Sequence, residues 1–559
     1  MKLLGSDVIV ECLLEQQVDT VFGYPGGQVI PLYDALYRYK DKIKHILTAH
    51  EQGASHAADG YARSSGKVGV CIATSGPGAT NLVTGLATAY MDSSPVVAIT
   101  GNVPVDLLGR DSFQEVDITG ITMPITKHNF IIKKAEDLAP TIRRAFYIAK
   151  EGRPGPVLID IPKDLMGKMV EYVKEEPKKV ESKVVRLRES DLEKAVDMLK
   201  EAQMPMCYIG GGVISSNASK ELNEFLERID APVCSSLMAL GAVPSTSERF
   251  TGMIGMHGTR VSNLLVNRCD LLVVIGGRFS DRVISKSSTF AKQAKILQLD
   301  VDPAEFNKNI YTHCHVIGDI KVVLSELNKR LEKVEHPEWK AYFESKKDRY
   351  PMKVASDAMR AKEIITALQD SLPEDSIITT EVGQHQMWAS QFLQHNAPRH
   401  FLTSGGLGTM GFGTGAAIGA QVSHPSQRVV NIAGDGSFRM NCNELATIAR
   451  YRLPIIIVVM NNHCLGMVRQ WQNLFFNQHY SETTLDTPLD WVMLAQAYGV
   501  HGMRLNKEDD PASIFKEAIA LNAPVVIDCQ IPTDDKVLPM VAPGASILDM
   551  IGVVDNSQH

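Results

Sequence analysis

Short apolar runs alternate along the chain with longer stretches in which apolar residues recur at helical spacing. Runs rich in Val and Ile are typical of strands that are buried on both faces of a parallel sheet. The alternation therefore predicts an α/β fold made of doubly wound domains. Strands are expected at residues 68–74, 96–100, 157–161, 206–210, 271–275, 296–300, 376–379, 429–433, 455–460 and 525–529.

The pattern is interrupted by two charged stretches that contain proline, at 172–190 and at 329–354. Both are typical of solvated linkers or linker helices. A chain of 559 residues is long enough for about three to four domains. We expect three parallel-sheet domains, at 1–172, 190–330 and 355–559, and find no internal repeat in the sequence.

Two polar clusters follow neighbouring predicted strands near the C-terminal end of the chain. Gly434-Asp435-Gly436 closes the run at 429–433, and Asn461-Asn462 closes the run at 455–460. One helix, at about 441–450, is expected between them, so that a right-handed β-α-β unit brings both strand ends to one edge of the sheet. A carboxylate and an amide oxygen suit Mg²⁺, and the glycines allow a diphosphate to approach closely. The pairing resembles the thiamine diphosphate signature.

Composition and charge narrow the classes of function. Apolar residues make up 44% of the chain, charged residues 22%, and the formal net charge is −7. No basic block indicates nucleic acid, no apolar run is long enough for a membrane helix, and no signal peptide is evident. The nine cysteines are scattered without a C-x-x-C pair, which favours reduced, buried thiols in a cytoplasmic protein over disulfides or a zinc site.

Glu51 opens a helical stretch that follows the apolar run 43–48. A carboxylate at this position commonly does no more than favour the helix dipole. Thiamine chemistry gives it a second interpretation, because a carboxylate hydrogen-bonded to N1′ of the aminopyrimidine raises the proton affinity of that ring nitrogen.

Together, eleven motifs resemble the catalytic, large-subunit family of acetohydroxyacid synthases, also called acetolactate synthases, over about residues 5–553. Several motifs are general to thiamine diphosphate enzymes, whereas SFQE, RFSDR and the motif that contains Trp471 are more specific. The motifs are VFGYPGG (21–27), HEQGASHAADGYAR (50–63), TSGPGATN (74–81), SFQEVD (112–117), GRPGPVLIDIPKD (152–164), GMHG (255–258), RFSDR (278–282), GQHQMW (383–388), SGGLGTMGFG (404–413), GDGSF (434–438) and LGMVRQWQ (465–472).

The resemblance implies roles for most of these residues. Glu51 contacts N1′ of a cofactor held by the partner subunit, and Asp435, Asn462 and the carbonyl of Cys464 bind Mg²⁺. The carbonyl of Gly408 contacts the 4′-amino group, and Met410 is the wedge that bends the cofactor. The diphosphate is expected at Gln384, His385, Gly436 and Ser437, and the reaction centre at Gly27, Phe113, Gln114 and Lys163. Without the family, Gln114 is an ordinary loop residue and Lys163 an ordinary surface charge.

By the same resemblance, Trp471 shapes the pocket for the second 2-keto acid and Arg282 faces its carboxylate. Trp471 favours 2-ketobutyrate as acceptor and therefore the biosynthetic branch toward valine, leucine and isoleucine. Without the family, a Trp at this position is more often a core or interface aromatic.

The central block lacks the G-x-G-x-x-G fingerprint of NAD-binding domains. Its resemblance to the family implies an FAD site in which the flavin has no net redox role in the reaction. The residues expected there are Arg153, Gly210, Gly211, Gly212, Met256, His257, Gly258, Gly277, Arg278, Asp300 and Asp319.

Two positions depart from the family. Thr414-Gly415 stands where the family usually has Leu-Pro, and we expect this flexible pair to loosen the Met410 wedge. Ser280 stands where many members have Asp, which removes one expected flavin contact.

The resemblance implies a homodimer or homotetramer whose sites lie between the first domain of one subunit and the third domain of another. A separate regulatory small subunit is left open. The alternatives are a fermentative acetolactate synthase, a pyruvate oxidase or decarboxylase, a glyoxylate-using carboligase, and a flavoprotein without catalytic activity. The small-molecule partners expected are 2-keto acids.

Overall fold

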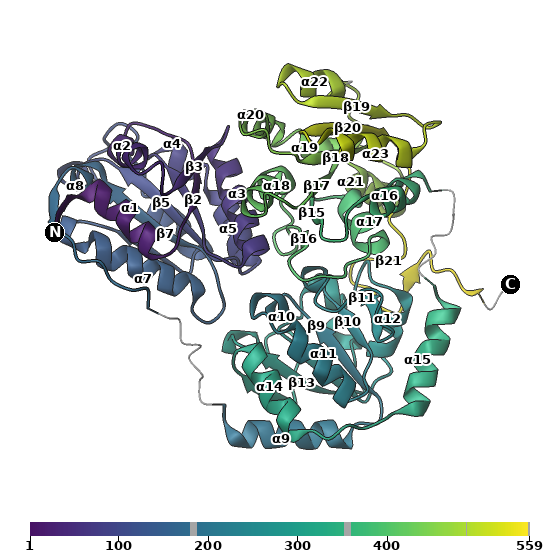
Figure 1. The fold of residues 1–559 in the computed structure, drawn as a ribbon. Coiled ribbons are helices and arrows are strands. Elements are labelled where there is room, and N and C mark those ends of the chain that lie inside the picture. Colours follow the sequence, from purple (N-terminus) through teal and green to yellow (C-terminus); the bar gives the residue numbers. More distant parts are fainter. Residues whose placement is uncertain (179–186, 352–358, 488, 557–559) are drawn as a thin grey trace.

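The computed structural model describes residues 1–178, 187–351, 359–487 and 489–556. It contains three six-stranded sheets, and every strand pair within them is parallel (Figure 1). Each sheet carries helices on both faces, which confirms the predicted fold of three doubly wound α/β units. The remaining strands form two small antiparallel pairs: β1 (Lys2–Leu4) with β8 (Met169–Glu171), and β21 (Met540–Val541) with β22 (Met550–Ile551).

The first sheet has the strand order β3-β2-β4-β5-β7-β6. Its strands are β2 (Thr20–Gly23), β3 (Lys44–Leu47), β4 (Gly69–Ala73), β5 (Val96–Asn102), β6 (His128–Ile131) and β7 (Val157–Pro162). One face packs on α1 (Gly5–Glu15), α2 (Ile30–Arg38) and α7 (Leu138–Lys150), and the other on α3 (Glu51–Ser65) and α5 (Val83–Met91). Short helices α4 (Pro77–Thr80), α6 (Ile118–Thr122) and α8 (Lys163–Met166) lie in its loops.

The middle sheet has the order β11-β10-β9-β12-β13-β14. Its strands are β9 (Pro205–Ile209), β10 (Val233–Ser235), β11 (Phe250–Met253), β12 (Leu271–Ile275), β13 (Lys295–Asp300) and β14 (Cys314–Ile317). Its helices are α9 (Glu189–Glu201), α10 (Gly212–Ser215), α11 (Ser219–Arg228), α12 (Arg260–Val266), α13 (Asp281–Ile284) and α14 (Ile320–Arg330).

Half of the stretch 329–354 is a linker helix. It forms α15 (Pro337–Arg349), which is held against the middle sheet by the buried Trp339 and Phe343. The indole N–H of Trp339 donates to the carbonyl of Pro205, 2.9 Å away. Residues 352–354 of this stretch, and 179–186 of the first linker, lie outside the described residues.

The third sheet has the order β16-β15-β17-β18-β20-β19. Its strands are β15 (Ile377–Thr380), β16 (Phe401–Leu402), β17 (Val429–Gly434), β18 (Ile456–Asn461), β19 (His501–Leu505) and β20 (Val525–Gln530). Its helices are α16 (Arg360–Ser371), α17 (Gln384–Phe392), α18 (Phe412–Ser423), α19 (Asp435–Phe438), α20 (Leu445–Arg450), α21 (Gly466–Phe475), α22 (Trp491–Ala497) and α23 (Pro511–Leu521).

The ten strands predicted from apolar runs are all present, with ends shifted by a residue or two. The helix expected at 441–450 is shorter than predicted, because a turn of 3₁₀ helix (Cys442–Glu444) precedes α20. The carboxylate of Glu444, the last residue of this turn, accepts from the backbone N–H groups of Ala49 and His50, which precede α3.

The first and third sheets have the same strand order when their strands are numbered along the chain, although the sequence shows no repeat. Between them, α3 and α18 pack against each other (Figure 1). A Cβ on Gly419 of α18 would lie 1.9 Å from the carbonyl oxygen of Ala57 on α3, so only glycine allows this approach. A single apolar cluster runs through both helices and joins the two sheets.

All nine cysteines are free, and eight of them are buried. In the described ranges, no helix is long and apolar enough to cross a membrane.

Candidate active site

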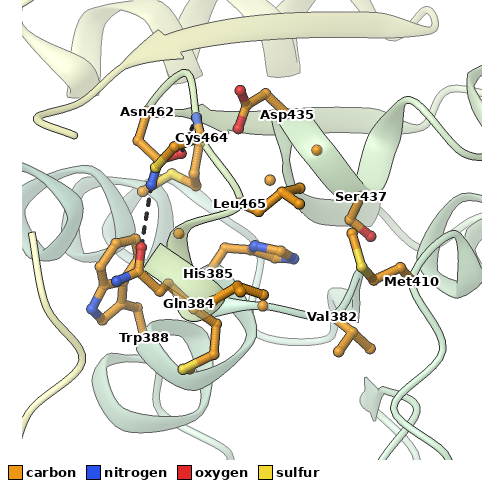
Figure 2. Close-up of a pocket in the computed structure, with 17 residues that line it drawn as sticks. Val382, Gln384, His385, Trp388, Met410, Asp435, Ser437, Asn462, Cys464 and Leu465 are labelled. Carbon is orange, nitrogen blue, oxygen red and sulfur yellow. Dashed lines mark hydrogen bonds between the residues drawn. The ribbon is translucent and has the colours of Figure 1, made fainter. Parts of the chain in front are cut away.

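A cavity opens at the carboxyl edge of the third sheet, where β15 and β17 end (Figure 2). The strand order reverses between these two strands, and parallel sheets bind ligands at such a point. The cavity brings together eight of the residues predicted for cofactor and metal: Gln384, His385, Met410, Asp435, Gly436, Ser437, Asn462 and Cys464. Its other lining residues are Val382, Gly383, Trp388, Gly434, Met460, Leu465, Gly466, Met467 and Val468.

Asp435 directly follows β17 and Asn462 directly follows the neighbouring strand β18, as the β-α-β prediction requires. Asp435 is 2% exposed, and burial raises the pKa of its carboxyl to about 6. Within the described chain no cation forms an ion pair with it. A buried carboxylate without a counter-charge is unfavourable, so a bound divalent cation would stabilise it. The side-chain oxygen of Asn462 accepts from the backbone N–H of Cys464, which closes the loop around the same point.

His385 lies across the cavity from Asp435 (Figure 2). Burial lowers the pKa of its imidazole to about 3, so the ring is neutral, and its Nε2 atom is buried without a hydrogen-bond partner. A side chain at Gly434 would displace this ring, because a Cβ there would lie 2.7 Å from His385 Nδ1. An unpaired polar ring atom and a backbone without side chains suit an oxygen-rich group such as a diphosphate.

The segment that carries Gly408 and Met410 closes one side of the cavity. Gly408 and Gly411 both have positive φ, +70° and +87°, which is the left-handed region that favours glycine. Gly411 is fixed through both backbone groups: its N–H donates to the carboxylate of Glu381, and its carbonyl accepts from the side-chain amide of Asn441. Neither Glu381 nor Asn441 is among the site residues predicted from the sequence.

The pair Thr414-Gly415, which was expected to loosen the wedge, is held by specific contacts in the structure. Thr414 is fully buried, and both its N–H and its hydroxyl donate to Glu381 at 2.9 Å. Gly415 faces α3, where a Cβ would lie 2.6 Å from the Cβ of His56. Hydrogen bonds and a close helix contact therefore fix both residues in place.

The residues predicted for the reaction centre lie elsewhere, at the carboxyl edge of the first sheet. Glu51 is the first residue of α3 and accepts from the amide of Asn81, 2.9 Å away. Gly27 is exposed, Phe113 is 84% exposed, Gln114 has a φ of +60°, and Lys163 begins α8. None of these residues lines the cavity beside Asp435. One subunit alone therefore does not bring the predicted reaction-centre residues together with the predicted cofactor and metal residues.

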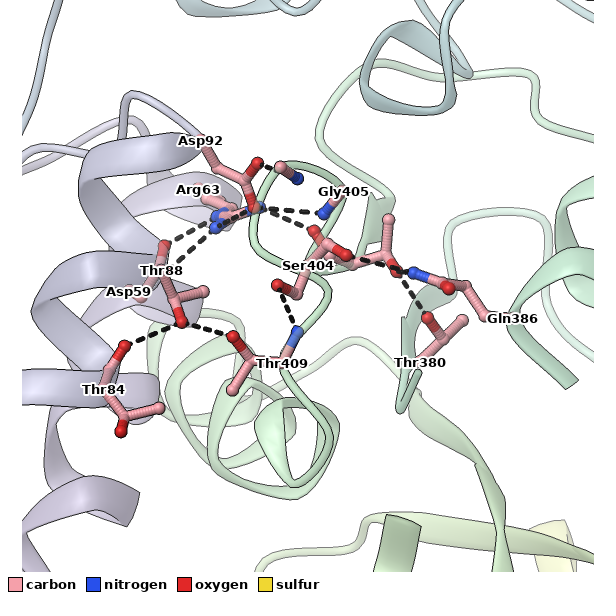
Figure 3. A network of polar contacts seen from close by, with 12 residues as sticks. Asp59, Arg63, Thr84, Thr88, Asp92, Thr380, Gln386, Ser404, Gly405 and Thr409 are labelled. Atoms are coloured by element: carbon pink, nitrogen blue, oxygen red, sulfur yellow. Dashed lines mark hydrogen bonds and ion pairs between the residues drawn. The ribbon is translucent and has the colours of Figure 1, made fainter. Parts of the chain in front are cut away.

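A polar network fastens the first domain to the segment before the wedge (Figure 3). Arg63 of α3 pairs with Asp59 and Asp92 and donates to the carbonyl of Thr403. The carboxylate of Asp92, which is fully buried, accepts from the backbone N–H groups of Gly405 and Gly406. The position of the Gly408–Met410 segment therefore depends on two helices of the first domain.

Trp471 and Arg282 come from different domains and meet, as their shared predicted role requires. The guanidinium of Arg282 lies 5.8 Å from the Trp471 ring, a cation–π contact. Trp471 also lines a second, largely apolar cleft with Met467, Val468, Gln472, Phe476, His479 and Ser481.

The residues predicted for a flavin gather at the carboxyl edge of the middle sheet. Gly210, Gly211 and Gly212 follow β9, Gly277 and Arg278 follow β12, and Asp300 ends β13. The strand order reverses between β9 and β12, which marks this edge as a ligand site. Burial raises the pKa of Asp300 to about 6.

Several of these residues also have structural contacts. Gly210 and Gly212 pack against the backbone of Gly276, so close packing alone requires them to be glycine. Asp319 caps α14 by accepting from the N–H of Val322. Arg153 is 3.3 Å from Asp302 and 3.2 Å from Glu305, and it joins the first domain to the middle one.

The loop after β11 completes the expected flavin set. Met256 contacts Arg282 through its sulfur, and desolvation lowers the pKa of the half-buried His257 to about 4. Gly258 permits a tight turn, because a Cβ there would meet the backbone of Ile254 at 2.6 Å.

Comparison with known proteins agrees with this geometry. Three family models match: the N-terminal TPP binding domain of thiamine pyrophosphate enzymes at residues 4–121, the central domain at 192–327, and the C-terminal TPP binding domain at 381–529. The acetolactate synthase isozyme 2 large subunit of Escherichia coli (strain K12) is 46% identical over 552 residues, which cover 98% of this chain and 99% of that protein.

Two further relatives come from other organisms. The probable acetolactate synthase large subunit of Methanocaldococcus jannaschii is 46% identical, over 98% of this chain and 95% of that protein. The acetolactate synthase large subunit of Parasynechococcus marenigrum is 45% identical, over 98% of this chain and 91% of that protein. The chain therefore belongs to the acetolactate synthase large-subunit family of thiamine pyrophosphate enzymes.

Proposed function

We propose that the protein is a thiamine diphosphate-dependent carboligase that decarboxylates pyruvate and transfers the remaining two-carbon unit to a second 2-keto acid. The acceptor is pyruvate, giving 2-acetolactate, or 2-ketobutyrate, giving 2-aceto-2-hydroxybutyrate. The observation that carries the proposal is the cavity in which Asp435, Asn462 and His385 lie opposite Met410. The names of the relatives support the same reaction.

Asp435, Asn462 and the carbonyl of Cys464 would hold Mg²⁺, which keeps few protein ligands and binds phosphate oxygens. Gln384, His385, Gly436 and Ser437 would bind the diphosphate, Gly408 would accept from the 4′-amino group, and Met410 would support the bend between the rings. When bound, thiamine diphosphate supplies an electron sink for decarboxylation.

Glu51 would hold the proton at N1′ of a cofactor bound to the partner subunit. Glu51 does not line the Asp435 cavity, and Gly27 and Phe113 are exposed, which together support a site completed by a second copy. The assembly proposed is a homodimer or a homotetramer, because each site then takes one edge from each subunit.

The remaining residues would select and orient the acceptor. Trp471 and Arg282, in contact with each other, would fit the side chain and the carboxylate of 2-ketobutyrate. Gln114 and Lys163 would approach from the partner's first domain and help to exclude water. A preference for 2-ketobutyrate would put the protein in the biosynthesis of branched-chain amino acids.

FAD is proposed at the carboxyl edge of the middle sheet, with no net redox role. Support for this position comes from the reversal of strand order between β9 and β12, because parallel sheets bind ligands at such a point. Further parts of the proposal are a cytoplasmic location, which the free cysteines support, and a separate regulatory small subunit, which the large-subunit names of the relatives support.

The test supplies pyruvate and 2-ketobutyrate together with Mg²⁺, thiamine diphosphate and FAD, and quantifies every product. We expect mainly 2-aceto-2-hydroxybutyrate with some 2-acetolactate. Acetolactate alone would indicate the fermentative enzyme. Acetate with oxygen uptake, or acetaldehyde, without carboligation would overturn the proposal.

Trp471→Leu sharpens the same assay. Because a change of side-chain volume in an apolar pocket alters selectivity by about 10-fold or more, the ratio of the two products is expected to fall by about that factor. Tyr37→Leu removes an aromatic that is 73% exposed on α2 and serves as the control, for which the ratio should stay unchanged.

A further inference from the structure

Glu381 follows β15 directly and is a fully buried carboxylate. Its Oε2 atom accepts from the N–H of Gly411 at 2.7 Å and from the hydroxyl of Ser437 at 3.0 Å. Its Oε1 atom accepts from the N–H and the hydroxyl of Thr414, both at 2.9 Å. Four donors from two separate segments therefore converge on one side chain.

The charge of Glu381 is balanced without a cation. Among the described residues no ion pair includes it, and burial raises its pKa above the ordinary value while the hydrogen bonds oppose that rise. Two of its donors, Gly411 and Thr414, are the N-cap and third residues of α18, a helix of 12 residues. The carboxylate thus caps the helix from a distant point in the sequence, where the helix dipole favours a negative charge.

The direction of both hydroxyl bonds is fixed by the surroundings. The Thr414 hydroxyl also accepts from the amide of Asn431 at 3.2 Å, so its proton is directed at Glu381. The Ser437 hydroxyl accepts from the N–H of Gly411 at 3.2 Å, which directs its proton at Glu381 as well. All four partners of the carboxylate are therefore donors.

These contacts surround the segment that carries the proposed wedge. Gly411 is the residue after Met410, and its N–H and carbonyl are both bonded. Ser437 belongs to the loop that begins with Asp435, so Glu381 also links the wedge to the proposed metal site. One carboxylate sets the distance between two walls of the cavity.

We propose that Glu381, acting with Thr414, is the positioning residue that holds Met410 in register with the Asp435 loop. It acts through the backbone of the wedge and contacts neither cofactor nor substrate. The inference rests on the proposed function. Thr414, which departs from the Leu of the family, supplies two of the four bonds, whereas Leu would supply only the backbone one.

Glu381→Gln tests the inference with a side chain of nearly equal volume. The amide NH₂ of the new Gln must face either the donors of Gly411 and Ser437 or the two donors of Thr414. In both cases it faces a backbone N–H, which cannot turn into an acceptor. The segment that carries Met410 would have to shift so that the Gln NH₂ and the backbone N–H no longer face each other. Displacements on the order of 1 Å in positioning groups lower rates by about 100-fold.

The measurement is the rate at which the C2 proton of bound thiamine diphosphate exchanges into D₂O, followed by NMR without substrate. For Glu381→Gln we expect this rate and kcat to fall by about 10- to 100-fold. The KM for pyruvate and the cofactor dissociation constant should change by less than about 5-fold, because the binding groups remain.

Two Thr414 variants keep the inference testable if Glu381→Gln does not fold. Thr414→Val removes the hydroxyl and should slow exchange by about 3- to 10-fold, whereas Thr414→Ser keeps the hydroxyl and should restore the rate. Asp230→Asn is the matched control: Asp230 is a buried carboxylate of the middle domain that accepts from the N–H of His336. This control should lower thermal stability without changing exchange.

Two outcomes separate this inference from the proposed function. If the wild-type protein exchanges the C2 proton rapidly and Glu381→Gln or Thr414→Val folds with an unchanged rate, the positioning role is wrong. If the wild-type protein neither binds thiamine diphosphate nor consumes pyruvate, the proposed function fails, and the inference fails with it.

Discussion

The first and third sheets share one strand order but differ at the point where that order reverses. In the third sheet, an open cavity lies beyond the carboxyl ends of β15 and β17. In the first, the corresponding gap between β2 and β4 is filled: a Cβ on Gly26 would lie 2.4 Å from the Cγ2 of Thr74, whose hydroxyl accepts from the N–H of Gln28. One topology thus provides a cavity in one sheet and a packed edge in the other.

A second correspondence lies in the interiors of the same two sheets. Asn102 on β5 donates to Asp160 on β7, and Asn461 on β18 donates to Asp528 on β20. Asp528 also pairs with Arg504 at 3.2 Å. Within the described residues Asp160 has no cationic partner, and burial raises its pKa to about 7. The sheets therefore share a buried Asn–Asp pair but differ in how its charge is balanced.

The largest expected effect comes from placing one substitution at the edge of the first sheet and another at the edge of the third sheet, in separate chains. Glu51→Gln removes the proposed proton-holding group of the first sheet, and Asp435→Asn removes the proposed metal ligand of the third. Each variant alone should lose about 10³-fold in kcat. Mixed and re-assembled, they should recover about one quarter of wild-type activity, because half of the dimers are hybrids with one intact site.

The control for this experiment is a double variant that carries both changes in one chain. When the double variant is mixed with the wild-type protein, each hybrid dimer has one site without Glu51 and one site without Asp435. Neither site of the hybrid is therefore intact. Absence of any recovery in the mixture of single variants would show that Glu51 and Asp435 serve the same site within one chain.

The next effect concerns the joint between the two sheets. Asp92→Asn leaves the buried Arg63 with one fewer carboxylate and weakens the bonds to Gly405 and Gly406. Removing one partner of a buried ion pair costs about 3–5 kcal/mol, so the first thermal transition should move to lower temperature. Calorimetry is the measurement.

Asp34→Asn is the control, because that carboxylate is 65% exposed where it pairs with Arg38. Surface pairs contribute about 0–1 kcal/mol, and its transition should hardly move. Equal shifts for the two variants would contradict the structural importance of the joint.

The smallest effect distinguishes the two buried Asn–Asp pairs by pH. The pKa of Asp160 rises from its ordinary 3.8 to about 7, so the folded state binds a proton that the unfolded state releases between these values. Its contribution to stability is therefore full below about pH 4 and is lost as pH rises through about 7.

Asp160→Asn removes this dependence. Its stability relative to the wild type should increase by on the order of 2 kcal/mol between about pH 5 and pH 8, measured as thermal midpoints. Asp528→Asn, which breaks the pair with Arg504, should instead lower the midpoint. Parallel pH curves for wild type and Asp160→Asn would contradict the assignment.

Much of the fold followed from local pattern. Apolar runs identified the ten predicted strands because strands buried on both faces need continuous apolar sequence. The Asp435 and Asn462 placements followed from the right-handed crossover, which leaves little freedom in where neighbouring parallel strands end. The repeated strand order escaped the sequence pattern, because order depends on which strands pair and not on the residues within each strand.

The contacts that sequence reasoning missed all join distant segments. Glu381 precedes a recognised motif but contacts residues about 30 and 56 positions later, and Arg63 donates to Thr403 across 340 positions. The only signal for Glu381 was a carboxylate at the end of a strand, next to the residues expected at the diphosphate. Thr414-Gly415, judged flexible from the sequence, is firmly bonded because its partners come from β15 and α3.

The sequence by itself determined the fold class, the family and the chemical types at each sheet edge, since these depend on residue identity and short-range spacing. Tertiary structure alone decided that the third-sheet edge is open while the first is filled. It also decided that one buried carboxylate joins the wedge to the Asp435 loop, and that Glu51 lies apart from the cavity of its own chain. The reason is physical: side-chain hydrogen bonds and backbone contacts form between segments that folding brings together, and no local pattern records them.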